Sequence, residues 1–288
     1  MKDASRTRTR PSRAGLGRML RPMALGAATV LAAGLILAAG SPASAAPRGK
    51  ALTPAEIEAR IATYKKAHPN DLVGLDKFQQ TLGASPTWYL PAGATAPISA
   101  SAAQALLDSA GQMGPTAVPV DAFTVGISGT WYASSSQWRI AGSWNFRDNY
   151  VNGSDPDDVS ELTADPSMCI NKAMSTFFYI YNYTGTQQTS NWYLYDSGVS
   201  HPTTVVRIND GVSGFVTNFD HGEHVTYFGK ASSGCSSNRV RAAYKYEHNQ
   251  DYSSNSISIS VAWNFLSISY SGSGGSSLQK SSQVFDHS

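Results

Sequence analysis

The sequence is poor in charged residues and contains none of the short motifs that identify common enzymes. Asp, Glu, Lys and Arg together make up 15% of its 288 residues. The G-x-S-x-G, H-E-x-x-H, phosphate-loop and G-x-G-x-x-G dinucleotide patterns are all missing from it. These absences argue against the enzyme classes that carry such motifs. A catalytic site assembled from residues far apart in the sequence remains open.

Cysteine is also scarce, since the chain has two, Cys169 and Cys235. They lack the C-x-x-C spacing of metal and redox sites. An isolated pair in an oxidising compartment is most simply a disulfide. Closing a loop of about 66 residues would stabilise the fold by roughly 4 kcal/mol in the chain-entropy model. We therefore predict a Cys169–Cys235 disulfide.

The first 45 residues have the order of a secretory signal peptide. Residues 1–21 carry seven Lys or Arg and one acid, an apolar run covers Met23–Ala39, and Ala43-Ser-Ala45 offers a cleavage site. The alternative is a membrane anchor, because the run is about as long as the shortest spanning helices. The signal interpretation predicts an extracellular protein that starts at Ala46 and has no transmembrane span in its mature chain.

Removing this segment changes the sign of the net charge. The whole chain has 22 basic and 20 acidic residues, and the part after residue 45 keeps 15 and 19 of them. A net charge near −4 leaves no excess of positive charge to neutralise a phosphate backbone. We therefore expect no nucleic-acid partner.

Residues 46–118 form a segment with helical signals and many prolines. Thr53-Pro-Ala-Glu56 is a capping box with proline at the first helical position, and His68-Pro69 ends the helix. Shorter helices are predicted from Asn70 or Asp71 to Leu82 and over Ser101–Ala110. The apolar content is too low for an independent core. The segment is interpreted as an accessory arm, a pro-segment or a spacer.

From residue 119 to 275 the sequence changes to short β-branched and aromatic runs separated by Gly, Asn, Asp and Ser. Strands without intervening helices predict a mainly β fold, an antiparallel β-sandwich or Greek key that follows the short helical segment. The predicted strands are Ala122–Tyr132, Gln137–Phe146, Thr176–Tyr183, Asn191–Tyr195, Thr203–Ile208, Gly214–Asn218, His224–Phe228, Arg239–Glu247 and Ser256–Tyr270.

The last predicted strand has the most regular alternation. Ile257, Ile259 and Val261 alternate with serine, and the alternation slips by one residue after Phe265. A one-residue slip moves side chains to the opposite face, so we predict a bulge or a change of sheet at Phe265–Leu266. The Gly/Ser-rich end, 276–288, is predicted to be a flexible tail.

Four ionisable residues, Asp220, His221, Glu223 and His224, lie within five positions of one another. Two imidazoles and two carboxylates could bind a divalent metal or act as acid and base. A polar hairpin turn around Gly222 is the simpler interpretation. A second polar cluster, from Asp148 to Asp158, could be a calcium loop but is predicted to be a solvated loop with Asx turns.

Two short segments resemble βγ-crystallin Greek-key domains. Phe178-Tyr-Ile-Tyr-Asn-Tyr183-Thr-Gly185 is similar to the aromatic hairpin of that family, and Asn209-Asp210-Gly-Val-Ser213-Gly214 resembles its calcium loop without the final Ser. The resemblance covers about residues 175–263. It implies a secreted calcium binder or a small metalloprotease inhibitor, with Asn209, Asp210 and Ser213 as ligands of one calcium ion.

The sequence favours a secreted, non-catalytic binding or inhibitory protein whose partner is an extracellular protein or a polysaccharide. One alternative is an extracellular hydrolase with a dispersed site, in which His201, His221, His224 or His248 meets a carboxylate and a hydroxyl. Another is a pore-forming protein, suggested by the serine-alternating run 252–273. That pattern equally describes a half-buried strand.

Overall fold

The computed structural model confirms a mainly β protein with a short helical segment before an antiparallel sandwich. The signal segment, Asp220 and the calcium loop at Asn209–Gly214 lie outside the residues that the structure describes. The described residues are 51–92, 94–110, 123–146, 158–181, 187–188, 192–195, 202–208, 221–250, 256–262, 265–271, 276–282 and 284–287.

The described residues before β3 include three helices, α1 (Pro54–Ala67), α2 (Leu72–Thr81) and α3 (Ala100–Ala110), with two short strands of the first sheet between α2 and α3. The predicted capping box is present, because Thr53 accepts a hydrogen bond from the Glu56 amide and Glu56 accepts one from the Thr53 amide. None of the described helices is long and apolar enough to cross a bilayer.

The first sheet has seven strands in the order β2-β1-β3-β4-β10-β6-β7, with antiparallel pairing throughout. Its bounds are β1 Trp88–Leu90, β2 Ile98–Ser99, β3 Phe123–Tyr132, β4 Gln137–Phe146, β6 Ile170–Tyr181, β7 Gln187–Gln188 and β10 His221–Lys230.

The second sheet has six strands. Five follow the order β14-β11-β5-β9-β8, and β15 also pairs with β11. Its bounds are β5 Asp158–Ala164, β8 Trp192–Tyr195, β9 Thr203–Ile208, β11 Val240–Gln250, β14 Ser276–Ser281 and β15 Phe285–His287.

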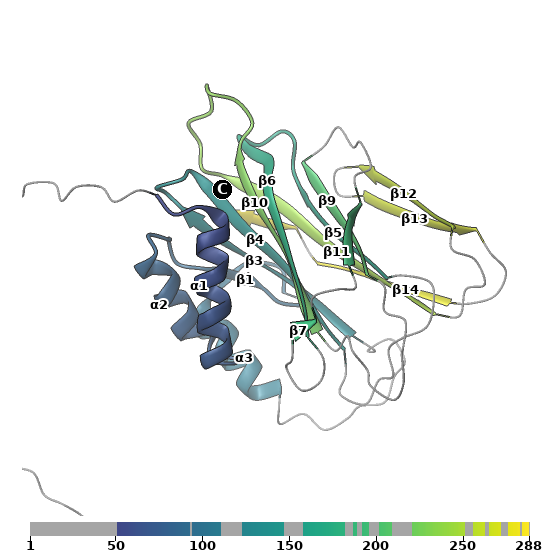
Figure 1. The fold of residues 1–288 in the computed structure, drawn as a ribbon, viewed down its shortest axis with the longest axis horizontal. Helices are drawn as coiled ribbons and strands as arrows, with labels where there is room; N and C mark the ends of the chain where they lie inside the picture. Colours follow the sequence, from purple (N-terminus) through teal and green to yellow (C-terminus); the bar gives the residue numbers. More distant parts are fainter. Residues whose placement is uncertain are drawn as a thin grey trace, which may run out of the picture. The chain divides into compact units, whose positions relative to one another are not determined.

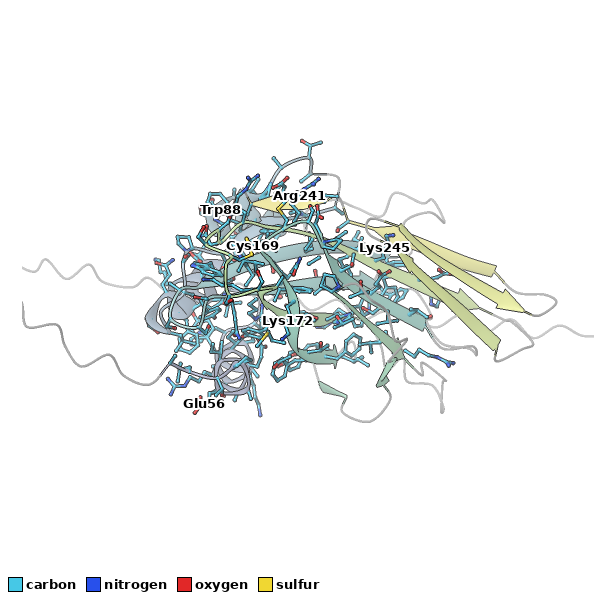
Figure 2. The ribbon with its side chains drawn as sticks, turned by 90° about the horizontal axis from the view of Figure 1, so that it is seen from above. Glu56, Trp88, Cys169, Lys172, Arg241 and Lys245 are labelled. Atoms are coloured by element: carbon cyan, nitrogen blue, oxygen red, sulfur yellow. A yellow bond between two sulfur atoms is a disulfide. The ribbon has the colours of Figure 1, made fainter. Side chains whose placement is uncertain are left out.

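The seven-stranded sheet packs on both of its faces (Figures 1 and 2). Alternation along β4 sends Ile140 and Trp144 into the core between the sheets and Arg139 and Ala141 towards the helices. A second apolar cluster joins Ile57 and its neighbours in α1 and α2 to that helix-facing side. The helical segment therefore completes a core that it shares with the sheet.

The remaining strands, β12 (Ser256–Ala262) and β13 (Phe265–Ser271), form a separate two-stranded ribbon. Ala262 pairs with Phe265, so the chain reverses through a connection of two residues. The single strand predicted over Ser256–Tyr270 is wrong, and the slip in its alternation marks a hairpin. Figure 1 draws this ribbon as a pair of strands apart from the labelled strands of the two sheets.

The flexible tail predicted for 276–288 is wrong over its described residues. β14 pairs with β11 along six residues, and β15 pairs with the start of β11. Phe285 of β15 is fully buried and lies against Gly129, where a Cβ atom would collide with its ring. One large aromatic side chain thus anchors this end of the chain in the core.

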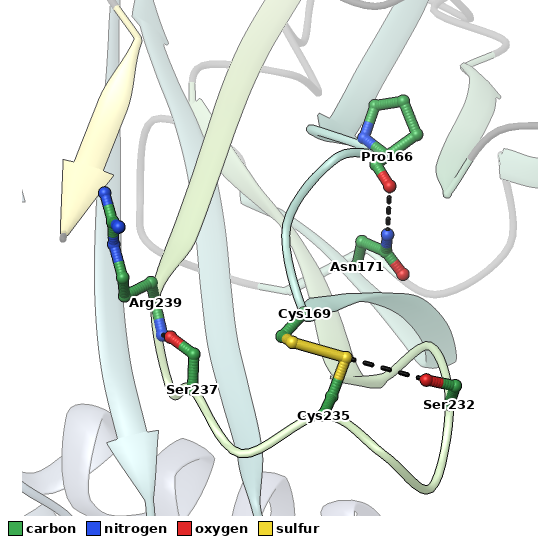
Figure 3. The surroundings of a disulfide bond; sticks show 7 residues. All are labelled: Pro166, Cys169, Asn171, Ser232, Cys235, Ser237 and Arg239. Carbon is green, nitrogen blue, oxygen red and sulfur yellow. Dashed lines mark hydrogen bonds between the residues drawn. A yellow bond between two sulfur atoms is a disulfide. The ribbon is translucent and has the colours of Figure 1, made fainter.

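The predicted Cys169–Cys235 disulfide is formed (Figure 3). Cys169 immediately precedes β6, and Cys235 lies between β10 of one sheet and β11 of the other. The Ala231 amide donates to the Cys169 carbonyl at 2.9 Å beside the bond. The disulfide therefore holds the connection that passes from one sheet to the other.

Candidate functional site

The polar cluster predicted around His221 is divided between the two faces of a strand. His221, Glu223 and His224 all belong to β10, so the predicted hairpin turn is wrong at these positions. Neighbouring strands flank β10 on both sides, and alternation places Glu223 towards the helices and His224 between the sheets. These residues therefore do not act as one site.

On the helix side, Glu58 of α1 is buried over the sheet and holds a network of charged and phenolic groups. The Arg139 Nε atom donates to Glu58 Oε1 at 2.6 Å, and the hydroxyls of Tyr227 and Tyr179 donate to the two carboxylate oxygens at 2.8 and 3.0 Å. Burial opposes the charge of Arg139, but the adjacent Glu58 carboxylate holds the pKa of Arg139 well above its ordinary value. This network fastens α1 to the sheet through a charged Arg139.

Glu223 extends this network to Lys65 in the last turn of α1. Its carboxylate contacts Lys65 Nζ at 2.6 Å and lies 3.8 Å from Arg139 Nη2. Burial alone would raise the pKa of Glu223, but the two cations lower it below its ordinary value. Lys65 belongs to α1 and Arg139 to β4 under it, so this cluster serves the docking of the helix.

On the opposite face, His224 lies in a hydroxyl network between the sheets. Its Nδ1 is 3.1 Å from Ser160 Oγ, and its Nε2 is 2.9 Å from Thr204 Oγ1. Ser160 also meets the Tyr244 hydroxyl at 3.1 Å. Burial lowers the pKa of His224 to about 3, so the imidazole is neutral.

The second histidine of the interior, His248, does meet a carboxylate. Its Nδ1 is 3.0 Å from Asp158 Oδ1, and Tyr246 donates its hydroxyl to the same carboxylate at 2.6 Å. Asp158 is fully buried and begins β5, which corrects its prediction as part of a solvated loop. Two hollows on the described residues are lined by α1 and its neighbours, and neither of them includes His224 or His248.

No three His, Cys, Asp or Glu side chains form a metal-binding group within the described ranges. The calcium ligands predicted at Asn209, Asp210 and Ser213 are outside those ranges, as is His201, and they stay predictions.

The face of the six-stranded sheet that points away from the sandwich core is buried and partly charged. Leu162 and Ala164 of β5 face the core, so Val159, Glu161 and Thr163 face the other way. These three residues are at most 1% exposed. Neither Glu161 carboxylate oxygen has a hydrogen-bond partner, and burial raises the pKa of Glu161 to about 8 against the opposing effect of Lys245.

The ribbon β12–β13 is the feature with the sharpest division of chemistry. Three cross-strand pairs are apolar: Ile257 with Tyr270, Ile259 with Ile268, and Val261 with Leu266. Of the four alternate pairs, three are serine with serine, Ser256 with Ser271, Ser258 with Ser269 and Ser260 with Ser267, and the fourth, next to the connection, is Ala262 with Phe265. Paired residues share a face of an antiparallel ribbon, so the register gives one apolar face and one face that carries the serines and the Ala262–Phe265 pair.

Comparisons with known proteins do not identify a family. No protein-family model matches the sequence, and no curated protein matches it. One solved structure with a detectable likeness is described as "pH-induced modulation of Streptococcus parasanguinis adhesion by Fap1 fimbriae". It has 6% sequence identity and a TM-score of 0.26, with 56% of this chain and 79% of that chain covered. A likeness at this level carries no argument about the fold or function of this protein.

Proposed function

We propose that this is a secreted, non-catalytic protein that inserts the ribbon β12–β13 into lipid bilayers and forms pores. The observation that carries the proposal is the register of the ribbon, which places six apolar residues on one face and six serines on the other, with the Ala262–Phe265 pair on the serine face next to the connection. Strands that cross membranes around a water-filled channel alternate in this way, with apolar residues towards lipid and polar residues towards water.

The distribution of charged residues along the sequence also supports insertion of the ribbon into a bilayer. Residues 252–279 contain no Asp, Glu, Lys, Arg or His, in a chain whose other parts carry all five. A charge on the lipid side of a membrane-crossing strand costs about 2–4 kcal/mol at the bilayer centre. A segment of 28 residues without any charge can therefore enter a bilayer without this cost.

An isolated ribbon has two unpaired edges, and backbone groups left unpaired in hydrocarbon cost several kcal/mol each. In the part of the chain that the structure describes, β12 and β13 pair with each other alone. The proposal therefore requires several copies, whose ribbons pair edge to edge and enclose the pore with their serine faces.

The secreted location rests on the signal-like first 45 residues and on the disulfide, which oxidising compartments maintain. The hydrolase alternative loses its main candidates, because His224 and His248 are both at most 2% exposed and lie between the sheets. A binding or inhibitory role needs a protein or polysaccharide ligand, and the contacts of the described residues indicate none.

Release of a dye from lipid vesicles tests the proposal with two variants of neighbouring residues. Ile259→Lys places a charge at the middle of the apolar face, and Ser258→Lys places the same charge on the serine face. We expect the protein to release the dye, Ile259→Lys to lose at least about tenfold in activity, and Ser258→Lys to stay within a few fold. A cost of 2 kcal/mol or more at the lipid face corresponds to this loss.

Thermal unfolding of both variants in solution controls for misfolding, and neither should differ greatly from the unchanged protein. Absence of release from neutral and from anionic phospholipid vesicles would contradict the proposal. Equal loss in the two variants would contradict the assignment of the faces.

A further inference from the structure

The larger of the two hollows on α1 has the size of a small-molecule binding site. Its volume is about 470 Å³, and such sites typically measure about 300–1,000 Å³. Ile57 and Ile61 turn one side of α1 towards the sheet, so the hollow lies on another side of the helix, next to α2 (Figure 1). The residues that line it are Ala59, Arg60, Thr63, Tyr64, Ala67 and His68 along α1 and at its C-cap, and Phe78 of α2.

The hollow is long and mostly apolar. Its lining along α1 runs from Ala59 to His68, which is about 14 Å at 1.5 Å per residue. The stacked rings of Tyr64 and Phe78 contribute to it, and the side chains of Ala59 and Ala67 are too short to fill the space beside them. An elongated apolar ligand therefore fits this site better than a compact polar one.

The aromatic lining is held in place without a ligand. The Tyr64 ring stacks on Phe78 with 4.7 Å between the ring centroids and lies 4.6 Å from the His68 ring. The Tyr64 hydroxyl donates to Asp71 Oδ2 at 3.0 Å, and the Gly74 amide donates to Asp71 Oδ1 at 2.8 Å. A Cβ atom at Gly74 would collide with both partners of this hydroxyl–carboxylate bond. Binding would order few further side chains, which lowers its entropic cost.

The two ends of the hollow differ in charge. Arg60 lies at one end, and within the described ranges its guanidinium makes no ion pair or hydrogen bond. Glu56, the acid one turn before it, already accepts the hydrogen bonds of the capping box. Beyond the other end, hydrogen bonds from Gly74 and Tyr64 lower the pKa of Asp71, and the C-terminus of α1 adds its own negative partial charge. An anion is therefore favoured at the Arg60 end alone.

We propose that this hollow binds a single-chain lipid anion, a free fatty acid, with its carboxylate on Arg60 and its chain along Tyr64 and Phe78. A guanidinium can donate two parallel hydrogen bonds to one carboxylate. The chain removes the aromatic and alanine side chains from water along the length of the hollow. A lipid with two chains exceeds the volume of the hollow, and a cationic amphiphile would bring its charge against Arg60. This binding does not depend on the insertion of the ribbon into a membrane.

Calorimetric titration of the whole protein with sodium decanoate tests the site. We expect one saturable site with a Kd of about 2 mM or lower, which is the affinity that typical ligand efficiencies give for a ligand of this size. Ala67→Leu places a larger side chain in the hollow and should weaken binding at least about tenfold. Ala55→Leu, the same change at an exposed position of α1 outside the hollow, should leave binding unchanged.

A second pair of variants tests the contact with the carboxylate. Arg60→Gln removes the cation from the hollow and should weaken binding about three- to tenfold. Lys66→Gln removes the same charge from an exposed residue of α1 outside the hollow and should leave binding unchanged. Thermal unfolding of each variant without decanoate verifies that it folds.

The outcomes that would overturn the proposal are distinct. Absence of saturable binding up to about 10 mM decanoate would exclude a fatty-acid site. Equal losses in Ala67→Leu and Ala55→Leu would exclude the hollow as the place of the chain. Equal effects of Arg60→Gln and Lys66→Gln would exclude Arg60 as the partner of the carboxylate.

One further variant separates this site from the ribbon. Ile259→Lys, which should lose dye release, should bind decanoate like the unchanged protein. Loss of decanoate binding in Ile259→Lys would place the fatty acid on the ribbon and overturn the site on α1. Decanoate binding by a protein that releases no dye from vesicles would contradict pore formation and support the site on α1.

Discussion

Helix α1 is fastened to the seven-stranded sheet by a buried arginine–carboxylate pair, whereas the ribbon β12–β13 shares no backbone ladder with either sheet among the described strands. Moving α1 would take Glu58 away from the buried Arg139 and leave Glu223, at 3.8 Å, as its carboxylate partner. Moving the ribbon would break none of the described strand pairings with the two sheets. It would also break no ion pair made by residues 252–279, because these residues are free of charge. The contrast separates a helix that is held by buried charges from a ribbon that pairs only with itself among the described strands.

The largest effect should come from breaking the attachment of α1 at Glu58. In Glu58→Ala the Arg139 guanidinium loses its buried partner, which typically costs 3–5 kcal/mol in the free energy of unfolding. Denaturant unfolding measures the change. The double variant Glu58→Leu with Arg139→Met should recover most of the loss, because it removes both charges together. A single variant that loses less than about 1 kcal/mol would mean that α1 is not held by this pair.

The disulfide should give the next largest effect. Cys169→Ala opens a loop of 66 residues, and its removal should cost about 2–5 kcal/mol. Thiol titration of the unchanged protein under denaturing, non-reducing conditions should find no free thiol. The bond lies at the opposite end of β11 from the ribbon, so vesicle leakage at low temperature should persist in the variant. Leakage lost without unfolding would show that the two regions are coupled.

A smaller effect should arise at Glu161, on the outer face of the six-stranded sheet. Burial raises the pKa of Glu161 to about 8, so this group stabilises the folded state fully only below its unfolded pKa, and the contribution is lost as the pH rises through 8. The free energy of unfolding should fall between pH 6.5 and 8 by at most about 1.4 kcal/mol per pH unit. In Glu161→Gln this slope should disappear.

His224 does not obscure that measurement. Burial lowers the pKa of His224 from 6.5 to about 3. The contribution of His224 to the free energy of unfolding is therefore fully present above pH 6.5 and is lost as the pH falls through 3. If the free energy of unfolding of Glu161→Gln still falls between pH 6.5 and 8, another titratable group causes the fall.

Much of the fold follows from the sequence where the apolar pattern is regular. The bounds predicted for Gln137–Phe146 and Thr203–Ile208 agree with β4 and β9, and the capping box at Thr53 begins α1 as predicted. β5 was missed because the residues that it buries, among them Asp158 and Glu161, are polar. Patterns of hydrophobicity cannot reveal a strand whose interior contacts are hydrogen bonds.

Only part of the candidate site, the ribbon β12–β13, can be predicted from the sequence. The alternation of serine with apolar residues indicates an amphipathic strand, but a slip of one residue has the same sequence signature in a bulge and in a hairpin. Trp263-Asn264 is not one of the turn dipeptides that mark a hairpin. The pairing of Val261 with Leu266 resolves the ambiguity, and it places six apolar residues of the two strands on one face, whereas Ala262 and Phe265 share the face of the serines.

Ion flow across a planar bilayer tests the central claim most directly, because it shows which face of the ribbon lines the pore. The account predicts stepwise increases in conductance with the unchanged protein. Ser260→Asp should shift the selectivity of those steps towards cations, whereas Val261→Thr, one residue away on the apolar face, should leave the selectivity unchanged. Conductance steps whose ion selectivity is unchanged in Ser260→Asp would contradict the claim that the serine face lines the pore. The absence of any steps would contradict pore formation itself.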